Sequence, residues 1–238
     1  MGLMLERRDL LRRVGVVGIG ASALGRTLRA APIVDADVAR DRLFTRVVPL
    51  PPTPGSIQGP YYVNPALVRR DITEGVAGLP VRLFVRVLDA TTCQPIPNAA
   101  VDVWHADAAG VYSGFTAQGT QGQTWLRGIQ YAAPDGICFF DSVFPGWYPG
   151  RTAHLHIKVR PDPQTELTTQ LYFDQLIGFP GLDLMQAIYQ WVSPYDVRGP
   201  SPTTNQNDFW FLPQTSMLSI PDPSGAFGIW TGIVIAVL

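Results

Sequence analysis

The sequence predicts an all-β domain, and we expect a two-sheet β-sandwich with short helices and long loops. Short runs rich in Val, Ile, Phe and Tyr recur along the chain and are separated by turn residues. Of the 238 residues, 23 are Gly and 22 are Pro, so turns are frequent and long helices are disfavoured. Many short strands with little helix are typical of a β-sandwich or a barrel.

The expected elements follow from local pattern. Val81–Val87 alternates apolar and basic residues, which is the period-two pattern of a half-buried strand. Among the later residues, only 181–192 has helical spacing. The apolar side of that helix is expected to carry Leu184, Ile188, Tyr189 and either Trp191 or Val192. The strands expected in chain order are 80–90, 100–106, 136–144, 153–160, 167–173 and 228–238.

The charge distribution predicts an exported protein that does not bind nucleic acid. The net charge is only -1, which argues against a nucleic-acid partner. Arg7 and Arg8 precede a short apolar run, Val14–Leu24, that is too short to span a bilayer. This arrangement resembles a twin-arginine export signal. We predict that residues 1–35 are this signal and a linker, with no stable membrane insertion after export to the periplasm or outside the cell.

The remaining residues, 36–238, are expected to form one domain. The alternative for the N-terminus is an amphipathic segment that carries its arginines by chance. Cys93 and Cys138 could form one disulfide in an exported protein or remain two free thiols. The sequence leaves both arrangements open.

Two of the three histidines of the chain lie at His154 and His156. Within the expected strand, residues i and i+2 point to the same face, so both imidazoles point together while Leu155 and Ile157 point the opposite way. Imidazole is a common ligand of transition metals, and the pair could meet one ion. The alternative is a solvent-exposed strand face that carries two polar residues.

Six segments distinguish these interpretations, because their order and spacing resemble one enzyme family. They are GPYY, RRDITEG, PNAAVDVWHADAAGVYSGF, WLRGIQ, PGWYPGRTAHLHIKV and LTTQLYF, between Gly59 and Phe173. Together they resemble the intradiol ring-cleavage dioxygenases, including the secreted branch of that family. The long helical N-terminal segment through which the catechol enzymes dimerise has no counterpart here, so a homo-oligomer stays an open expectation.

The resemblance implies a non-haem Fe(III) site between strands and loops. The family holds its iron through two tyrosinates and two histidines, and the matching residues are Tyr112, Tyr148, His154 and His156. Phenolate is a hard anionic donor that suits Fe(III). Tyr148 would also accept a catechol proton, Arg151 would face the substrate, and Gln170 would help hold it. His105 also matches a family position, and we interpret it as a structural histidine.

We therefore expect an Fe(III)-dependent intradiol dioxygenase that acts on a catechol-type aromatic and O2. The resemblance implies cleavage between the two hydroxylated carbons to a cis,cis-muconate-type diacid. The alternative is a non-catalytic β-sandwich that binds an aromatic or a carbohydrate, because residues 90–104 also resemble transthyretin-like sandwiches. A cupin-type metal site fails, because no histidine follows His156. An acidic substrate would need a further cation, for which the candidates are Lys158, Arg127 and Arg69.

Overall fold

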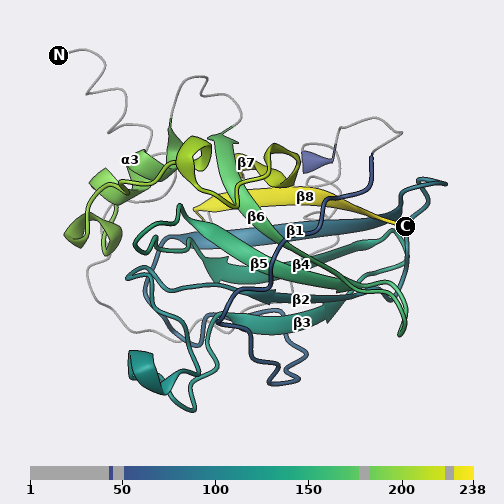
Figure 1. Cartoon of the computed structure of the whole chain (residues 1–238), viewed down its shortest axis with the longest axis horizontal. Helices are drawn as coiled ribbons and strands as arrows, with labels where there is room; N and C mark the ends of the chain where they lie inside the picture. The colour runs from purple at the N-terminus through teal and green to yellow at the C-terminus, as the bar shows by residue number, and fades with distance from the viewer. Residues whose placement is uncertain (1–42, 45–50, 177–182, 223–227) are drawn as a thin grey trace.

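A computed structural model describes residues 43–44, 51–176, 183–222 and 228–238 (Figure 1). The predicted export signal, residues 1–35, lies outside these ranges. Strands dominate the described residues, so the all-β prediction is confirmed. Their bounds are β1 Pro80–Asp89, β2 Ala100–Trp104, β3 Arg127–Tyr131, β4 Ile137–Val143, β5 His154–Arg160, β6 Leu167–Leu176, β7 Ser216–Pro221 and β8 Ile229–Val237. The helical elements are α3 Leu184–Trp191 and the 3-10 turns η1 Thr116–Gln118, η2 Tyr195–Val197, η3 Asn205–Asn207 and η4 Pro213–Thr215.

The strands form one hydrogen-bonded sheet in the order β3-β2-β5-β6-β7-β8-β1-β4. Most neighbours are antiparallel, whereas β1 pairs with β8 and β6 pairs with β7 in parallel. The expected division into two sheets is not confirmed, because backbone pairing continues without a break from β3 to β4. Figure 1 shows β5 crossing the middle of the molecule, with β2 and β3 on one side and β6 and β7 on the other.

Residues 67–72 connect the two edge strands of this sheet. The backbone N–H of Arg69 donates to the carbonyl of Ile129 in β3 at 3.0 Å. Three residues later, the N–H of Ile72 donates to the carbonyl of Asp141 in β4, also at 3.0 Å. The sheet therefore nearly closes on itself, and the hydrogen-bonding groups of its edges are used within the chain.

The predicted elements are confirmed in type, with two omissions. All six expected strands are present, but β3 and β7 were not expected. Helix α3 begins after Asp183, whose carboxylate accepts a hydrogen bond from the backbone N–H of Gln186 at 3.0 Å. Its buried side continues to Val192 rather than Trp191.

The core determines which side of β5 is left for chemistry. Leu155 and Ile157 are fully buried in the main hydrophobic cluster, which also takes up the apolar side of α3. The opposite face of β5 therefore carries the histidines. Cys93 and Cys138 are free thiols, so no disulfide supports this arrangement. Within the described ranges, no helix has the length and apolar character needed to cross a membrane.

Candidate metal and substrate site

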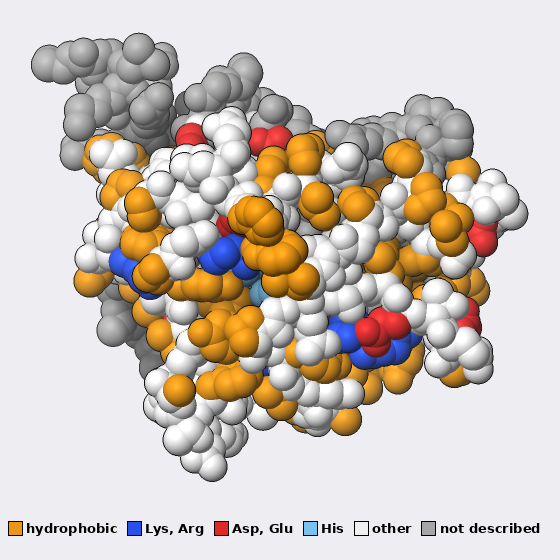
Figure 2. Space-filling view, in the orientation of Figure 1, with side chains coloured by type: hydrophobic (Ala, Val, Ile, Leu, Met, Phe, Trp, Pro, Cys, Tyr) orange, Lys and Arg blue, Asp and Glu red, His pale blue; other side chains and the backbone are white. Residues whose placement is uncertain are grey.

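Both histidines of β5 are buried. Relative exposure is 2% for His154 and 1% for His156, which excludes the solvent-exposed face that the sequence left open. As expected from their i, i+2 spacing, the two rings lie together, with centroids 4.9 Å apart. On one face of the molecule, Figure 2 shows a small histidine area between a Lys/Arg patch and hydrophobic side chains.

The ring of His154 is oriented by its own strand. Its Nδ1 lies 2.7 Å from the carbonyl oxygen of Thr152, which can only accept, so Nδ1 carries the proton. Its Nε2 lies 3.3 Å from the phenol oxygen of Tyr148. Burial, and then the charge of Arg151, lower the pKa of His154 to about 3. The imidazole is therefore neutral and presents a lone pair toward Tyr148, as a metal ligand requires.

The ring of His156 is held between two neighbours. Trp104 is its register partner on β2, and the two rings stack at 5.0 Å with 8° between their planes. On another side lies Gly59, where an added Cβ would come within 3.2 Å of His156 Cε1. Burial, and then His154, lower the pKa of His156 well below its usual range. Its buried Nδ1 has no hydrogen-bond partner among the described residues.

Tyr112 lies in the loop between β2 and β3. Thr120 Oγ1 donates to its carbonyl at 2.6 Å, and its ring stacks on Tyr61 with centroids 4.5 Å apart. The side chain is fully buried, yet its hydroxyl has no hydrogen-bond partner in the described part of the chain. Burial, and then the phenol of Tyr148, raise the pKa of Tyr112 well above its ordinary value. Ionisation of this phenol would require a strong local cation.

Tyr148 and Arg151 are brought together by one tight turn. The segment Tyr148-Pro149-Gly150-Arg151 closes through the backbone N–H of Arg151, which donates to the carbonyl of Tyr148 at 3.0 Å. Gly150 has a φ of 82°, as a type II turn requires at this position after proline. Burial raises the pKa of the Tyr148 phenol, although the charge of Arg151 opposes the shift.

The four predicted ligand residues form a closed ring of contacts. Besides the contact between the two histidines, the ring centroids are 5.5 Å apart for Tyr148 and His154, 6.0 Å for Tyr112 and Tyr148, and 6.1 Å for Tyr112 and His156. Nowhere in the described ranges do three His, Cys, Asp or Glu side chains gather as a metal-binding group. The donors available here are thus two phenols and two neutral imidazoles, a set that fits a hard, highly charged ion such as Fe(III).

Arg151 is held from three directions. Its Nε donates to both carboxylate oxygens of Asp208, at 3.1 and 2.9 Å. Its Nη2 donates to Gln170 Oε1 at 2.5 Å and lies 3.2 Å from the hydroxyl of Tyr172. Only Nη1 points to the predicted ligands, 3.4 Å from the phenol oxygen of Tyr148. Burial alone would lower the pKa of Arg151, but Tyr148 and Asp208 outweigh it and raise the pKa.

Gln170 lies beside Arg151, and both ends of its amide are used. Its Nε2 donates to the carbonyl of Ile57 at 3.1 Å, while its Oε1 accepts from Arg151. Gln170 is fully buried, and it is the register partner of His156 on β6. In the structure, Gln170 therefore holds the guanidinium of Arg151 by a hydrogen bond.

Comparisons with known proteins agree with this geometry. The profile of the protein family described as "Dioxygenase" matches residues 57–207. The chain belongs to the intradiol ring-cleavage dioxygenase family.

The similarity to individual family members is moderate. Chlorocatechol 1,2-dioxygenase of Rhodococcus opacus is 32% identical over 158 residues, or 55% of this chain and 59% of that protein. The solved intradiol ring-cleavage dioxygenase of Tetranychus urticae is 25% identical, with a TM-score of 0.69 over 79% of this chain and 94% of that one. The dioxygenase domain of a Streptomyces dioxygenase–carbohydrate-binding fusion is 27% identical, with a TM-score of 0.58 over 79% and 100%. The match spans about half the length of the curated relatives.

The other histidine of this dioxygenase-family chain differs from the pair on β5. His105 uses both ring nitrogens inside the protein, with Nδ1 2.8 Å from the carbonyl of Ala106 and Nε2 2.7 Å from Ser142 Oγ. Burial lowers the pKa of His105 to about 4, so the ring is neutral. The contacts agree with the structural role expected from the sequence.

Of the three cations considered for an acidic substrate, two are paired with acids and the third, Arg127, keeps a buried Nη1 without a partner among the described residues. Lys158 is paired with Glu166 and lies over the ring of Tyr62. Arg127 is buried and donates from Nε to Ser113 Oγ at 2.9 Å. The third candidate, Arg69, pairs with Glu74 at 2.5 Å. Whether one of them faces a substrate carboxylate stays a prediction.

Two residues around Arg151 were missed by the sequence reasoning. Tyr172 follows Gln170 at i+2 on β6, so strand alternation alone places it on the same face. Asp208 comes from a distant loop, and no local pattern connects it to β5. One signal was available, because Asp208 is an isolated acid before three aromatic residues, 209–211.

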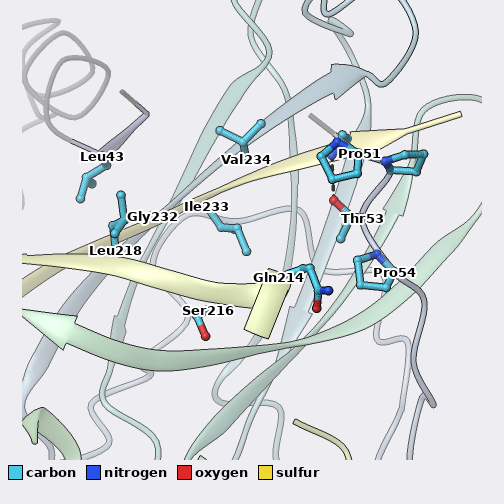
Figure 3. A pocket seen from close by; sticks show the side chains of 12 residues that line it. Leu43, Pro51, Thr53, Pro54, Gln214, Ser216, Leu218, Gly232, Ile233 and Val234 are labelled. Carbon is cyan, nitrogen blue, oxygen red and sulfur yellow. Dashed lines mark hydrogen bonds between the residues drawn. The ribbon is translucent and has the colours of Figure 1, made fainter. Parts of the chain in front are cut away.

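A separate hollow lies between β7, β8 and the extended residues 51–54 (Figure 3). It is lined mainly by proline and aliphatic side chains, and none of the described residues that line it is charged. It shares no residue with the ring of tyrosines and histidines. Its lining offers no metal ligand or proton carrier for ring cleavage.

Proposed function

We propose that this protein is an Fe(III)-dependent intradiol dioxygenase of catechol-type substrates. It inserts both atoms of O2 and cleaves the ring between the two hydroxylated carbons, giving a cis,cis-muconate-type diacid. The observation that carries the proposal is the closed ring of Tyr112, Tyr148, His154 and His156, in which two buried polar atoms have no hydrogen-bond partner among the described residues. Buried unsatisfied groups are costly, and a bound ion would satisfy the phenol oxygen of Tyr112.

Iron fits these donors in charge. The imidazoles are neutral, and the raised pKa values of the two phenols mean that a cation must be present before they ionise. Two tyrosinates would neutralise most of a trivalent charge, which makes burial of the ion tolerable. Bound Fe(III) would supply a Lewis acid that chelates both catechol oxygens and draws electron density from the ring.

The residues of the chain would carry out the proton and charge steps. Tyr148, in its ionised form, would accept one catechol proton at its phenolate oxygen when the substrate binds. Arg151, with Nη1 directed toward Tyr148, would stabilise the negative charge that develops on the ring and on the attacking oxygen. Gln170 and Asp208 hold that guanidinium from behind.

Oxygen uptake with isotope-labelled O2 tests this function. The iron-loaded protein should consume one O2 for each catechol, and the diacid product should contain both labelled atoms. Uptake without label in the product, or release of peroxide, would show a different oxidation. Catechol binding without any uptake would favour the non-catalytic binding module that the sequence left as the alternative.

We also propose export of the protein under the control of residues 1–35. Support comes from the arginine pair Arg7-Arg8 ahead of the apolar run 14–24. Cell fractionation of the full chain and of a variant with both arginines changed to lysine tests this. Equal amounts of both in the cytoplasm would contradict export by this route.

A further inference from the structure

We propose that Asp208 is a positioning residue, which fixes the guanidinium of Arg151 so that its Nη1 edge faces the phenol oxygen of Tyr148. The proposal rests on the proposed function, because Arg151 matters only if charge develops in front of it. The family profile ends at residue 207, so the match itself assigns Asp208 nothing.

The first argument is the geometry of the pair. Arg151 Nε lies 3.1 and 2.9 Å from the two oxygens of Asp208, and the carboxylate side chain is completely buried. Nε is the guanidinium nitrogen next to the aliphatic stem. A bond at Nε therefore stops rotation of the planar group, and both terminal nitrogens keep fixed directions.

The second argument is that Asp208 is itself immobilised. Its Oδ2 accepts from the backbone N–H of Thr152 at 2.8 Å, and its Oδ1 accepts from the backbone N–H of Trp210 at 2.9 Å. The first bond ties the carboxylate to the residue that follows Arg151. The second ties it to its own loop, so Asp208 joins the loop after η3 to the start of β5.

The third argument is the division of donors on Arg151. Nε and Nη2 are occupied by Asp208, Gln170 and Tyr172, whereas the contact of Nη1 within the described residues is the longer one of 3.4 Å to Tyr148. The protein thus fixes one side of the guanidinium and leaves the other available. Preorganised charge of this kind lowers a barrier without a reorganisation cost during the reaction.

A purely structural role for Asp208 is the competing interpretation, because the same carboxylate also stabilises its loop. Asn205 provides a matched control in that loop. It is buried, donates from Nδ2 to the carbonyl of Phe173 at 2.7 Å and accepts from Thr152 Oγ1 at 3.2 Å, whereas the hydrogen bonds of Arg151 within the described residues go to other side chains. Asn205→Ala should therefore weaken the loop without releasing the guanidinium.

Steady-state kinetics with catechol tests the proposal in the iron-loaded full chain. Asp208→Asn should lower kcat by about 10- to 100-fold, with KM changed by less than about 3-fold, because a misplaced charge mainly affects the transition state. Iron content and visible colour should match the wild type. Asn205→Ala should keep kcat within about 3-fold of the wild type, since Arg151 stays in place.

A double-mutant cycle separates positioning from stability. In the Arg151→Ala background, Asp208→Asn should lower kcat by less than about 2-fold, because nothing remains for the carboxylate to position. The proposal would be overturned if the kcat losses of Arg151→Ala and Asp208→Asn multiplied in the double variant. It would also be overturned if Asn205→Ala lowered kcat as much as Asp208→Asn. If Asp208→Asn does not fold, Asp208→Glu keeps the charge, and an unchanged kcat together with rapid solvent exchange of the Arg151 Nε–H in that variant would overturn the proposal.

A nuclear magnetic resonance measurement on the iron-free protein is independent of catalysis. The Nε–H signal of Arg151, assigned by its loss in Arg151→Lys, should exchange slowly with solvent in the wild type and rapidly in Asp208→Asn. Rapid exchange in both would contradict the pairing. Slow exchange in a wild type that cleaves no catechol would refute the proposed function while leaving the pairing established.

Discussion

The two sides of the candidate site differ in how their polar atoms are satisfied. On one side, the three guanidinium nitrogens of Arg151 each donate a hydrogen bond, to Asp208, Gln170 and Tyr148. On the other, the Tyr112 hydroxyl and His156 Nδ1 are buried without partners among the described residues. On the arginine side, protein groups satisfy the polar atoms, whereas on the ligand side two polar atoms are left unsatisfied by the described residues. Under the proposed function, a cation bound by the two phenols and the two imidazoles would use lone pairs on the ligand side.

The largest expected effect is the loss of iron chemistry from the ligand side. Tyr112→Phe should abolish stable iron binding and lower kcat/KM by more than about 1,000-fold, since a metal Lewis acid contributes several kcal/mol to such reactions. Because the Tyr112 hydroxyl has no hydrogen-bond partner among the described residues, the iron-free variant should unfold at an equal or higher denaturant concentration than the wild type. Iron analysis, kinetics and urea unfolding measure these three quantities.

Tyr195 provides the control for that substitution. Its buried hydroxyl donates to the carbonyl of Phe144 and accepts from the backbone N–H of Leu79. Tyr195→Phe should therefore lose about 1–3 kcal/mol of unfolding free energy and keep its iron. Similar stability losses in both variants would mean that Tyr112 is an ordinary core tyrosine.

The next largest effect is expected on the arginine side. Arg151→Lys keeps the positive charge but removes the planar fork that meets Asp208 and Gln170 together. We expect kcat to fall about 100-fold, with iron content and colour retained. If the variant loses its iron instead, then iron binding on the ligand side depends on Arg151.

The next effect concerns the acid stability that the buried His105 controls. Burial holds the pKa of His105 at about 4, compared with 6.5 in an unfolded chain. Between these values the unfolded chain binds more protons, so the unfolding free energy falls as the pH drops from 6.5 toward 4, by up to about 3 kcal/mol for this group. Urea unfolding at pH 7 and pH 4.5 should show a smaller loss in His105→Gln than in the wild type. An equal loss in both proteins would contradict the neutral, buried state of His105.

The smallest effect concerns substrate charge. Lys158 and Arg69 are paired with Glu166 and Glu74, and Arg127 keeps one completely buried donor, Nη1, without a partner among the described residues. A substrate carboxylate would therefore have to displace one of these acids or reach the buried Nη1. We expect kcat/KM for catechol to exceed that for the carboxylated analogue protocatechuate by about 10-fold or more, because an unpaired buried charge is unfavourable. The opposite preference in parallel assays would show that a cation faces the substrate.

Strand alternation predicted the part of the site that lies on one strand. The i, i+2 spacing was sufficient to place His154 and His156 together, and the same rule applied to Gln170 would have found Tyr172. Asp208 could not be found in this way, since it is 57 positions from Arg151 and its place depends on the tertiary fold. Local pattern carries no information about such a contact.

The unexpected strands have a similar explanation. β3 is only five residues long and contains the buried cation Arg127, and β7 ends with a proline, so neither shows a clear period of two. The near closure of the sheet depends on residues 67–72, which contact the edge strands β3 and β4 through isolated bridges. No sequence period marks a bridge of that kind.

The visible absorption spectrum of the iron-loaded protein tests the central claim most directly. Tyrosinate-to-Fe(III) charge transfer should colour the wild type, and anaerobic addition of catechol should move the band to longer wavelength. Tyr112→Phe should lack the colour, whereas Tyr195→Phe should keep it. A wild type that binds iron but stays colourless would remove Tyr112 and Tyr148 as ligands and contradict the ferric tyrosinate site.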